Sequence, residues 1–277
     1  MNLADALEVV TRTDPGLVRS HNEDAVYGSA EQGIAILADG MGGYNAGEVA
    51  SGMATTLLSS NFARLLQHSG DCRPEAVDPA TGKPAAHRHI EEEVVAANAA
   101  IYNTAQSQPQ YAGMGTTLVM AWFYDNKVSV AHIGDSRLYR LRGDDFRPIT
   151  RDHSLLQEQL DSGMITPEEA RHSQNRNLVT RALGVDAQVV PEIHDYEVEP
   201  GDIYLLCSDG LNDMVDDGEI GLTVQTLAAN LELAADQLIQ MANDNGGRDN
   251  VSVILVKVRG DFAVPQGWWQ KLLAWLK

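Results

Sequence analysis

The chain has 277 residues, of which 44% are hydrophobic, enough to fill the core of one large domain or two small ones. Its 20 basic and 39 acidic side chains give a net charge of −19, which argues against a nucleic-acid partner, since clustered Lys and Arg bind phosphate backbones. No apolar run predicts a membrane span, the N-terminus does not resemble a signal peptide, and two cysteines do not make a disulfide framework; we therefore expect a cytoplasmic protein.

The first half of the chain predicts three strands followed by two helices. Apolar runs of strand length and apolar spacing of helical period identify them. The predicted strands are 6–13, 24–28 and 33–39, and the predicted helices are 48–68 and 89–107. Residues 69–87 between the helices are rich in Gly, Pro and Asp, which predicts a solvent loop.

The second half of the chain is richer in strands. Residues 116–141 predict consecutive strands with a hairpin turn at Asp125-Asn126, and residues 150–186 form a polar, irregular insertion. Further strands are predicted at 189–199, 202–209 and 250–258, with a helix at 226–243. This order is not a regular βαβ alternation. It indicates an α+β domain in which sheets pack together and helices cover them.

Acidic residues recur where the predicted apolar strands begin or end. They are Glu23, Asp24, Asp39, Asp135, Asp209 and Asp249, with Arg19 four residues before Glu23. Taken singly, each has an ordinary explanation, because Asp-Gly after a strand is a common turn. Gathered at one edge, the carboxylates would repel one another, and Mg²⁺ or Mn²⁺ would relieve that repulsion because these cations prefer oxygen ligands. The pattern predicts an acidic metal site but does not name a reaction.

Seven segments, in order, resemble the type 2C family of metal-dependent serine/threonine protein phosphatases, most closely its compact bacterial members. They are TDPGLVRSHNEDA, ILADGMGGYNAGEVAS, GMGTTLV, AHIGDSRLYR, ITRDHSLL, LLCSDGLNDMV and GGRDNVSVILV, and they extend over about residues 8–258. The resemblance implies an α-β-β-α sandwich of two antiparallel sheets with a two-metal site at one end. It also implies hydrolysis of phosphoserine and phosphothreonine in proteins by a hydroxide that bridges the two metals.

The resemblance assigns roles residue by residue. Asp39 would bridge two Mn²⁺ or Mg²⁺ ions, and the Gly40 carbonyl would bind one of them. Asp209 and Asp249 would bind the other ion, and Arg19 would hold the substrate phosphate.

Three further positions complete this assignment. Glu23 would act mostly through water, with Asp24 supporting it. Asp135 matches the position that holds a third, weaker metal. With Arg19, the three acids Asp39, Asp209 and Asp249 are the predicted catalytic set.

One position departs from the family pattern. Many eukaryotic relatives carry a histidine, proposed as the general acid, where this chain has Met41. Methionine cannot donate a proton, so the acid is open. His132 and His153 lie in the matching segments and are either proton donors or structural hydrogen-bonding residues. Cys207, inside an apolar strand, is expected in the core rather than as a nucleophile.

The domain organisation expected is a catalytic domain over residues 1–260 and an amphipathic tail over residues 261–277. The insertion at 150–186 matches the family's flap, which either shapes substrate choice or is only a surface insertion. The tail's GWWQKLLAWLK segment either packs on its own domain or docks on a partner or membrane surface.

The expected partners are phosphorylated proteins and a cognate serine/threonine kinase, and we expect a monomer. Two other classes stay open: a non-catalytic pseudophosphatase that binds a phosphoprotein, and a structural cation module. The intact set of Asp39, Asp209 and Asp249 argues against the first, and Arg19 beside the acids argues against the second. A small phosphomonoester is an alternative substrate.

Overall fold

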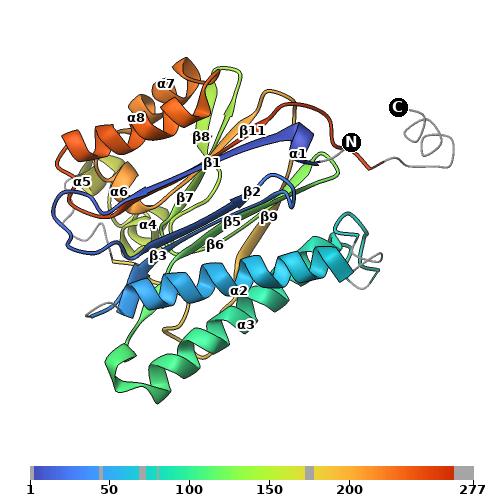
Figure 1. Cartoon of the computed structure of the whole chain (residues 1–277). Coiled ribbons are helices and arrows are strands. Elements are labelled where there is room, and N and C mark those ends of the chain that lie inside the picture. The colour runs from blue at the N-terminus through green and yellow to red at the C-terminus, as the bar shows by residue number, and fades with distance from the viewer. Residues whose placement is uncertain (1–2, 44–45, 69–72, 80, 172–177, 265–277) are drawn as a thin grey trace, which may run out of the picture.

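The computed structural model describes residues 3–43, 46–68, 73–79, 81–171 and 178–264. Two antiparallel sheets pack face to face, and helices cover the outer side of each (Figure 1). This is the α-β-β-α sandwich that the sequence predicted, so the predicted fold class is confirmed. Within the described ranges, no helix combines the length and apolar character needed to cross a membrane.

The first sheet carries the chain's N-terminal and C-terminal strands side by side. Its order is β1 (Leu7–Asp14), β11 (Val251–Val258), β10 (Ile203–Cys207), β7 (Arg137–Arg142) and β8 (Asp145–Pro148). Its outer face packs on α6 (Asp209–Asn212), α7 (Asp217–Thr226) and α8 (Leu231–Asp244). Helices α7 and α8 lie above the sheet in Figure 1. Because β11 is covered on both faces, almost all of its residues are buried, which explains its nearly continuous apolar sequence.

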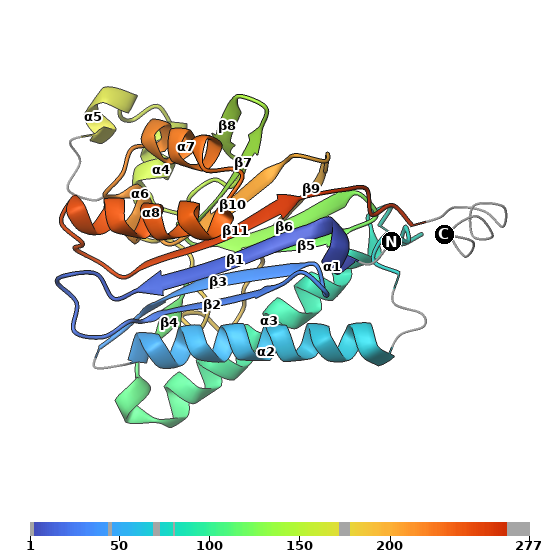
Figure 2. The same ribbon diagram turned by 45° about the horizontal axis from the view of Figure 1, so that its top comes forward.

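The second sheet is built largely from hairpins. Its order is β2 (Asp24–Ser29), β3 (Ile34–Met41), β5 (Leu118–Tyr124), β6 (Lys127–Ile133) and β9 (Glu192–Glu197), and the short β4 (Gly115–Thr116) pairs with the end of β3. The long helices α2 (Ala46–His68) and α3 (Ala85–Ser107) cover its outer face (Figure 2). Asp125 and Asn126, between β5 and β6, have φ of 44° and 54°, as a tight hairpin turn of this kind requires.

Strand β3 shows how the three apolar layers are divided. Its residues Ile34, Ile36 and Ala38 pack under α2 and α3, whereas Ala35 and Leu37 lie between the two sheets. Each fully buried Ile or Leu side chain contributes roughly 1.5–3 kcal/mol through burial. Because side chains alternate along a strand, Asp39 continues the row of Ala35 and Leu37 and points into the end of the space between the sheets.

The remaining elements are short. They are α1 (Leu3–Ala6), the 3₁₀ turn η1 (Pro109–Tyr111), α4 (Leu155–Asp161) and α5 (Pro167–Arg171). Helix α4 begins inside the predicted flap, where the Ser154 side chain accepts a hydrogen bond from the backbone N–H of Gln157 and so caps the helix.

Several predicted boundaries were wrong. Strand β3 does not end at Asp39 but runs to Met41, because Asp39 pairs with Asp24 and Gly40 with Thr116. The strand predicted at 189–199 is formed only by Glu192–Glu197, the part that pairs with β6.

The helix predicted at 226–243 begins only at Leu231, as α8, because the Asn230 side chain accepts from the Leu233 backbone N–H and caps the helix there. Helix α3 begins at Ala85, inside the predicted loop, and the sequence did not reveal α7 or β8. Of the predicted tail, residues 265–277 lie outside the described residues.

Candidate active site

The strand ends at one end of the sandwich surround a single polar pocket. The lining residues are Arg19, Glu23, Asp39, Gly40, Met41, Gly42, Thr117, Asp135, Val179, Asp209 and Asp249. Every predicted site residue except Asp24 is among them. Asp24 lies directly behind the pocket, opposite Asp39 in the β2–β3 ladder. The structure therefore brings the predicted residues together.

Each acid reaches the pocket from a strand end. Asp39 lies near the end of β3, and Asp209 is the first residue of α6, directly after β10. Asp249 precedes β11, and Asp135 follows β6. Since β3 and β6 belong to one sheet and β10 and β11 to the other, the pocket lies where strands of both sheets end.

Burial and mutual repulsion act strongly on these carboxyl groups. The pKa of Asp39 is raised well above its usual value by burial and by neighbouring acids, Asp24 first among them. The pKa of Asp209 is likewise raised well above its usual value, by burial and then by Asp135. Burial raises the pKa of Asp24 and that of Asp135 to about 6. Burial also raises the pKa of Glu23. The acids cannot all be ionised here without a compensating positive charge.

The donor set fits a hard divalent cation. The ligand atoms that line the pocket are carboxylate and carbonyl oxygens, which Mg²⁺ and Mn²⁺ prefer. One buried oxygen, Asp24 Oδ1, has no hydrogen-bond partner among the residues that the structure describes, although Oδ2 of the same group accepts from the Ser208 hydroxyl at 2.8 Å. An unpaired buried carboxylate oxygen is costly. Cations would supply the charge that this group of acids lacks.

Polar side chains outside the predicted set fix the acids in place. The Thr117 hydroxyl accepts from the Asp39 backbone N–H at 3.0 Å, and the Thr117 backbone N–H donates to the Asp39 carbonyl at 2.8 Å. The Asn250 side chain accepts from the Glu23 backbone N–H at 2.8 Å. Thr117 and Asn250 lie in GMGTTLV and GGRDNVSVILV, so those segments were the signal that could have revealed them.

Arg19 is a cation on the rim of the pocket. Its guanidinium Nη2 donates to Asp249 Oδ2 at 2.7 Å, and this hydrogen bond raises the pKa of Arg19. Its side chain is 52% exposed, so the remaining donors of the guanidinium face solvent at the mouth of the site. A planar guanidinium at that position can bind two oxygens of a phosphate.

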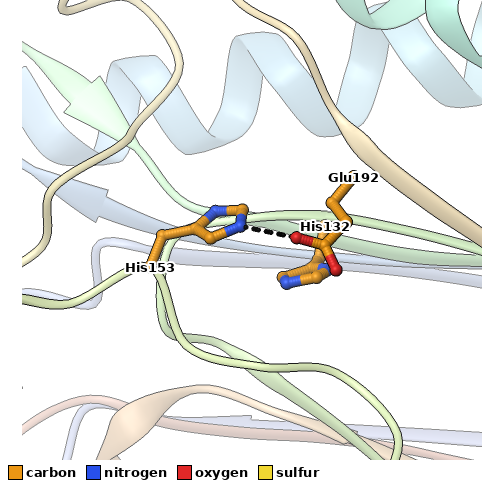
Figure 3. Close-up of side chains that lie close together, drawn as sticks. All are labelled: His132, His153 and Glu192. Carbon is orange, nitrogen blue, oxygen red and sulfur yellow. Dashed lines mark hydrogen bonds and ion pairs between the residues drawn. The ribbon is translucent and has the colours of Figure 1, made fainter. Parts of the chain in front are cut away.

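The two histidines of the matching segments lie behind the site rather than in it. The rings of His132 and His153 stack with centroids 4.6 Å apart, and Glu192 lies against them (Figure 3). Burial lowers the pKa of both rings, and neither residue lines the pocket. Their position therefore fits structural hydrogen-bonding residues better than proton donors to the substrate.

Three ligand atoms of His132, His153 and Glu192 lie within 4.8 Å of one another, a donor set suited to a transition metal. The hydrogen bonds oppose that use. His153 Nδ1 accepts from the Gly134 backbone N–H at 3.2 Å, so its proton is on Nε2, which faces Glu192 at 3.2 Å. A metal ion on Nε2 would force a proton onto Nδ1, against the N–H of Gly134.

Cys207 is a buried residue of the core under α6, α7 and α8, and burial raises the pKa of its thiol. A buried, protonated thiol is a poor nucleophile. The expectation that Cys207 belongs to the core is confirmed.

Comparisons with known proteins place this arrangement in a family. The family model "Protein phosphatase 2C" matches residues 18–252. PstP of Mycobacterium tuberculosis, a serine/threonine protein phosphatase, is 40% identical over 254 residues, which are 91% of this chain and 45% of PstP. The protein phosphatase PhpP of Streptococcus pneumoniae is 36% identical over 262 residues, which are 93% of this chain and 100% of PhpP.

Solved structures agree. The catalytic domain of PstP in complex with two manganese ions superposes with a TM-score of 0.78 at 38% identity, covering 92% of this chain and 99% of that one. The chain belongs to the protein phosphatase 2C family, a metal-dependent family of serine/threonine protein phosphatases. This confirms the predicted resemblance to the family. The chain spans about half the length of PstP, whereas its match covers the whole of PhpP.

Proposed function

We propose that this chain hydrolyses phosphoserine and phosphothreonine in proteins and so opposes a serine/threonine kinase. The observation that supports this most directly is the pocket in which Arg19 faces the acids Asp39, Asp209 and Asp249. Phosphate monoester hydrolysis needs a charged clamp for the phosphoryl oxygens and an activated water. The pocket has residues suited to both tasks.

Two divalent cations, when bound, lower the pKa of water and offset the charge of the phosphoryl group. Asp39 and the Gly40 carbonyl would hold one of them, and Asp39 would share the other with Asp209 and Asp249. Glu23 and Asp24 would support the site through water and hydrogen bonds, and Asp135 would hold a third, weaker cation. Arg19 would orient the substrate phosphate with the donors that it does not use on Asp249.

Residues 150–186 form the flap in this proposal and help to select substrates. Val179 supports this, because it lines the pocket together with Thr117 and Met41. Exchanging this segment for that of a relative, with His153 retained, is expected to change phosphopeptide preference while Mn²⁺ binding is kept. An unchanged preference would leave the flap as a surface insertion.

The activity test is phosphate release from a phosphothreonine peptide with Mn²⁺ and with EDTA. Asp39→Asn and Asp209→Asn are each expected to lower kcat by roughly 10²-fold or more, since both weaken the charge that stabilises the transition state. Asp145→Asn is the matched control, because Asp145 is exposed on β8 and does not line the pocket. We expect its activity to equal that of the unchanged chain.

Other results would favour the other classes. Mn²⁺ binding without phosphate release from any phosphopeptide would support a pseudophosphatase, and release only from small phosphomonoesters would support a metabolite phosphatase. The kinase partner, a monomeric state and a cytoplasmic location belong to the same proposal. The low cysteine content and the buried free thiol of Cys207 are consistent with a reducing compartment. Light scattering during size exclusion tests the monomer.

A further inference from the structure

His153 connects the beginning of the flap to the loop that carries Asp135. Its backbone N–H donates to the Gly134 carbonyl at 2.9 Å, and its ring Nδ1 accepts from the Gly134 N–H at 3.2 Å. Both polar backbone groups of Gly134 are therefore bonded to one residue. The His153 carbonyl in turn accepts from the Thr180 backbone N–H at 2.8 Å, next to Val179 in the pocket wall.

The ring of His153 is itself held on two sides. It stacks on His132, whose Nε2 donates to the Arg151 carbonyl at 2.8 Å, and its own Nε2 donates to Glu192 at 3.2 Å (Figure 3). A backbone carbonyl can only accept and a backbone N–H can only donate, so His132 carries a proton on Nε2, and His153 is neutral with its proton on Nε2. The lone pair of Nδ1 is thereby directed at Gly134.

Gly134 has little freedom on its other side. Its φ is +102°, and an added Cβ would lie 2.8 Å from the Thr117 side chain. Thr117 also shares a hydrogen bond of 2.7 Å with Ser136, the residue after Asp135. Asp135 is only 7% exposed. Its two neighbours in the chain are held by Thr117, which also bonds to Asp39, and by His153, which lies in the flap.

We propose that His153 is a positioning residue for Asp135. By accepting the Gly134 N–H, Nδ1 holds the Ile133–Gly134 peptide, at the start of the loop that carries Asp135, and so helps to orient the carboxylate for a divalent cation. The link through Thr180 makes this orientation depend on how the flap is seated. The inference rests on the proposed function, because it takes Asp135 as the ligand of the third, weakest cation.

Two substitutions separate the contacts of His153. Asn places its side-chain oxygen near the position of Nδ1 and keeps an acceptor for Gly134, whereas Gln places its polar atoms near Nε2 and keeps only the contact to Glu192. The backbone hydrogen bonds of residue 153 are present in both variants. His194→Gln is the control, because His194 also contacts Glu192, at 2.8 Å, but is exposed.

The measurement is a titration with Mn²⁺, without substrate, in which electron paramagnetic resonance reports free Mn²⁺. Asp135→Asn is the reference that removes the weakest binding step. We expect His153→Gln to weaken that step by roughly 10- to 100-fold, as is typical when the partner of a metal ligand is lost. His153→Asn is expected to stay within about threefold of the unchanged chain, as is His194→Gln.

Each outcome decides the proposal. Equal binding by the Asn and Gln variants at position 153, whether both normal or both weakened, would overturn it. A weakest step that persists in Asp135→Asn would also overturn it, because Asp135 would not be the ligand. These results are separate from failure of the proposed function, which is a loss of phosphate release by the Mn²⁺-loaded, unchanged chain. Melting curves of every variant confirm that binding is compared between folded proteins.

Discussion

Asp39 occupies a position at which one residue serves both the sheet and the site. Its backbone continues the β3 ladder through pairing with Asp24, while alternation along the strand directs its carboxylate into the end of the space between the sheets. Its N–H and carbonyl are both bonded to Thr117. These bonds fix the backbone of Asp39. The pKa of its carboxyl group is raised by loss of hydration and by the neighbouring acids.

Arg19 allows the phosphate clamp to be tested apart from the metal ligands. Arg19→Met is expected to lower kcat/KM for a phosphopeptide by roughly 10- to 100-fold, since a charge-assisted hydrogen bond contributes about 1.5–3 kcal/mol. Mn²⁺ affinity should not fall, because the change removes a positive charge next to Asp249. Steady-state kinetics and Mn²⁺ titration measure the two effects.

Arg12→Met is the control for this substitution. Arg12 is also a partly exposed arginine paired with acids, Glu232 and Asp236 on α8, but it does not line the pocket. We expect its kcat/KM to be unchanged. If Arg19→Met weakened Mn²⁺ binding as much as it lowered kcat/KM, Arg19 would act on the metal site and not on phosphate.

At the scale of elements, the start of α2 packs against the end of β3 with no room for a side chain. A Cβ added at Gly40 would lie 2.1 Å from the Gly47 carbonyl oxygen, and one added at Gly47 would lie 2.7 Å from the Gly40 carbonyl carbon and 2.8 Å from Glu23 Cδ. This close approach lets the first turn of α2 touch the site. In the ILADGMGG segment, Gly40 permits this close contact. Gly42 has a φ of +154°, which residues with a side chain rarely adopt.

Two glycines of α2 give a matched test of that contact. Gly47→Ala is expected to lower the free energy of unfolding by about 1–3 kcal/mol and to weaken Mn²⁺ binding, because the new methyl group must displace backbone at Gly40. Gly52→Ala meets nothing within 4 Å and should be neutral or stabilising by up to about 1 kcal/mol. Denaturant melts and Mn²⁺ titration measure both.

An equal effect of the two substitutions would mean that helix propensity alone, and not the contact with β3, decides the result. A loss of stability with normal Mn²⁺ binding would show that the Gly40–Gly47 contact holds the fold but does not shape the site.

At the scale of the whole molecule, the net charge of −19 affects stability most through the acids that lie inside the fold. Asp24 and Asp135 have pKa values raised from 3.8 to about 6. A group whose pKa is higher in the folded state binds protons more tightly when folded, so it favours folding below its unfolded pKa. That contribution is lost as the pH rises toward the folded pKa.

We therefore expect these acids to destabilise the metal-free chain progressively as the pH rises from about 4 to about 6, and the loss to persist at higher pH. Asp24→Asn removes one of them, and a pKa change from 3.8 to about 6 corresponds to on the order of 3 kcal/mol. In EDTA, the Tm of Asp24→Asn should rise relative to the unchanged chain as the pH goes from 5 to 7.5.

Excess Mn²⁺ should shrink this difference, because bound cations offset the charge of the ionised acids. Thermal melts at the two pH values, with EDTA and with Mn²⁺, check the expectation. Parallel pH dependence of the two proteins in EDTA would show that Asp24 is not the buried, strained carboxyl described here.

The sequence by itself determined the family, the sandwich class and the acidic residues that line the pocket. The motifs around Asp39, Asp209 and Asp249 are local, because in each of them the acid lies where an apolar run of strand length begins or ends. The hairpin at Asp125-Asn126 was equally readable, because only a few residue types adopt positive φ in a two-residue turn.

The tertiary structure alone decided how these segments meet. The extension of β3 to Met41 depends on pairing with β2 and β4. The link from His153 to Gly134 joins segments 19 residues apart through a ring nitrogen. Local propensity does not encode such contacts, because strand pairing and side-chain hydrogen bonds are fixed only when distant parts of the chain pack together.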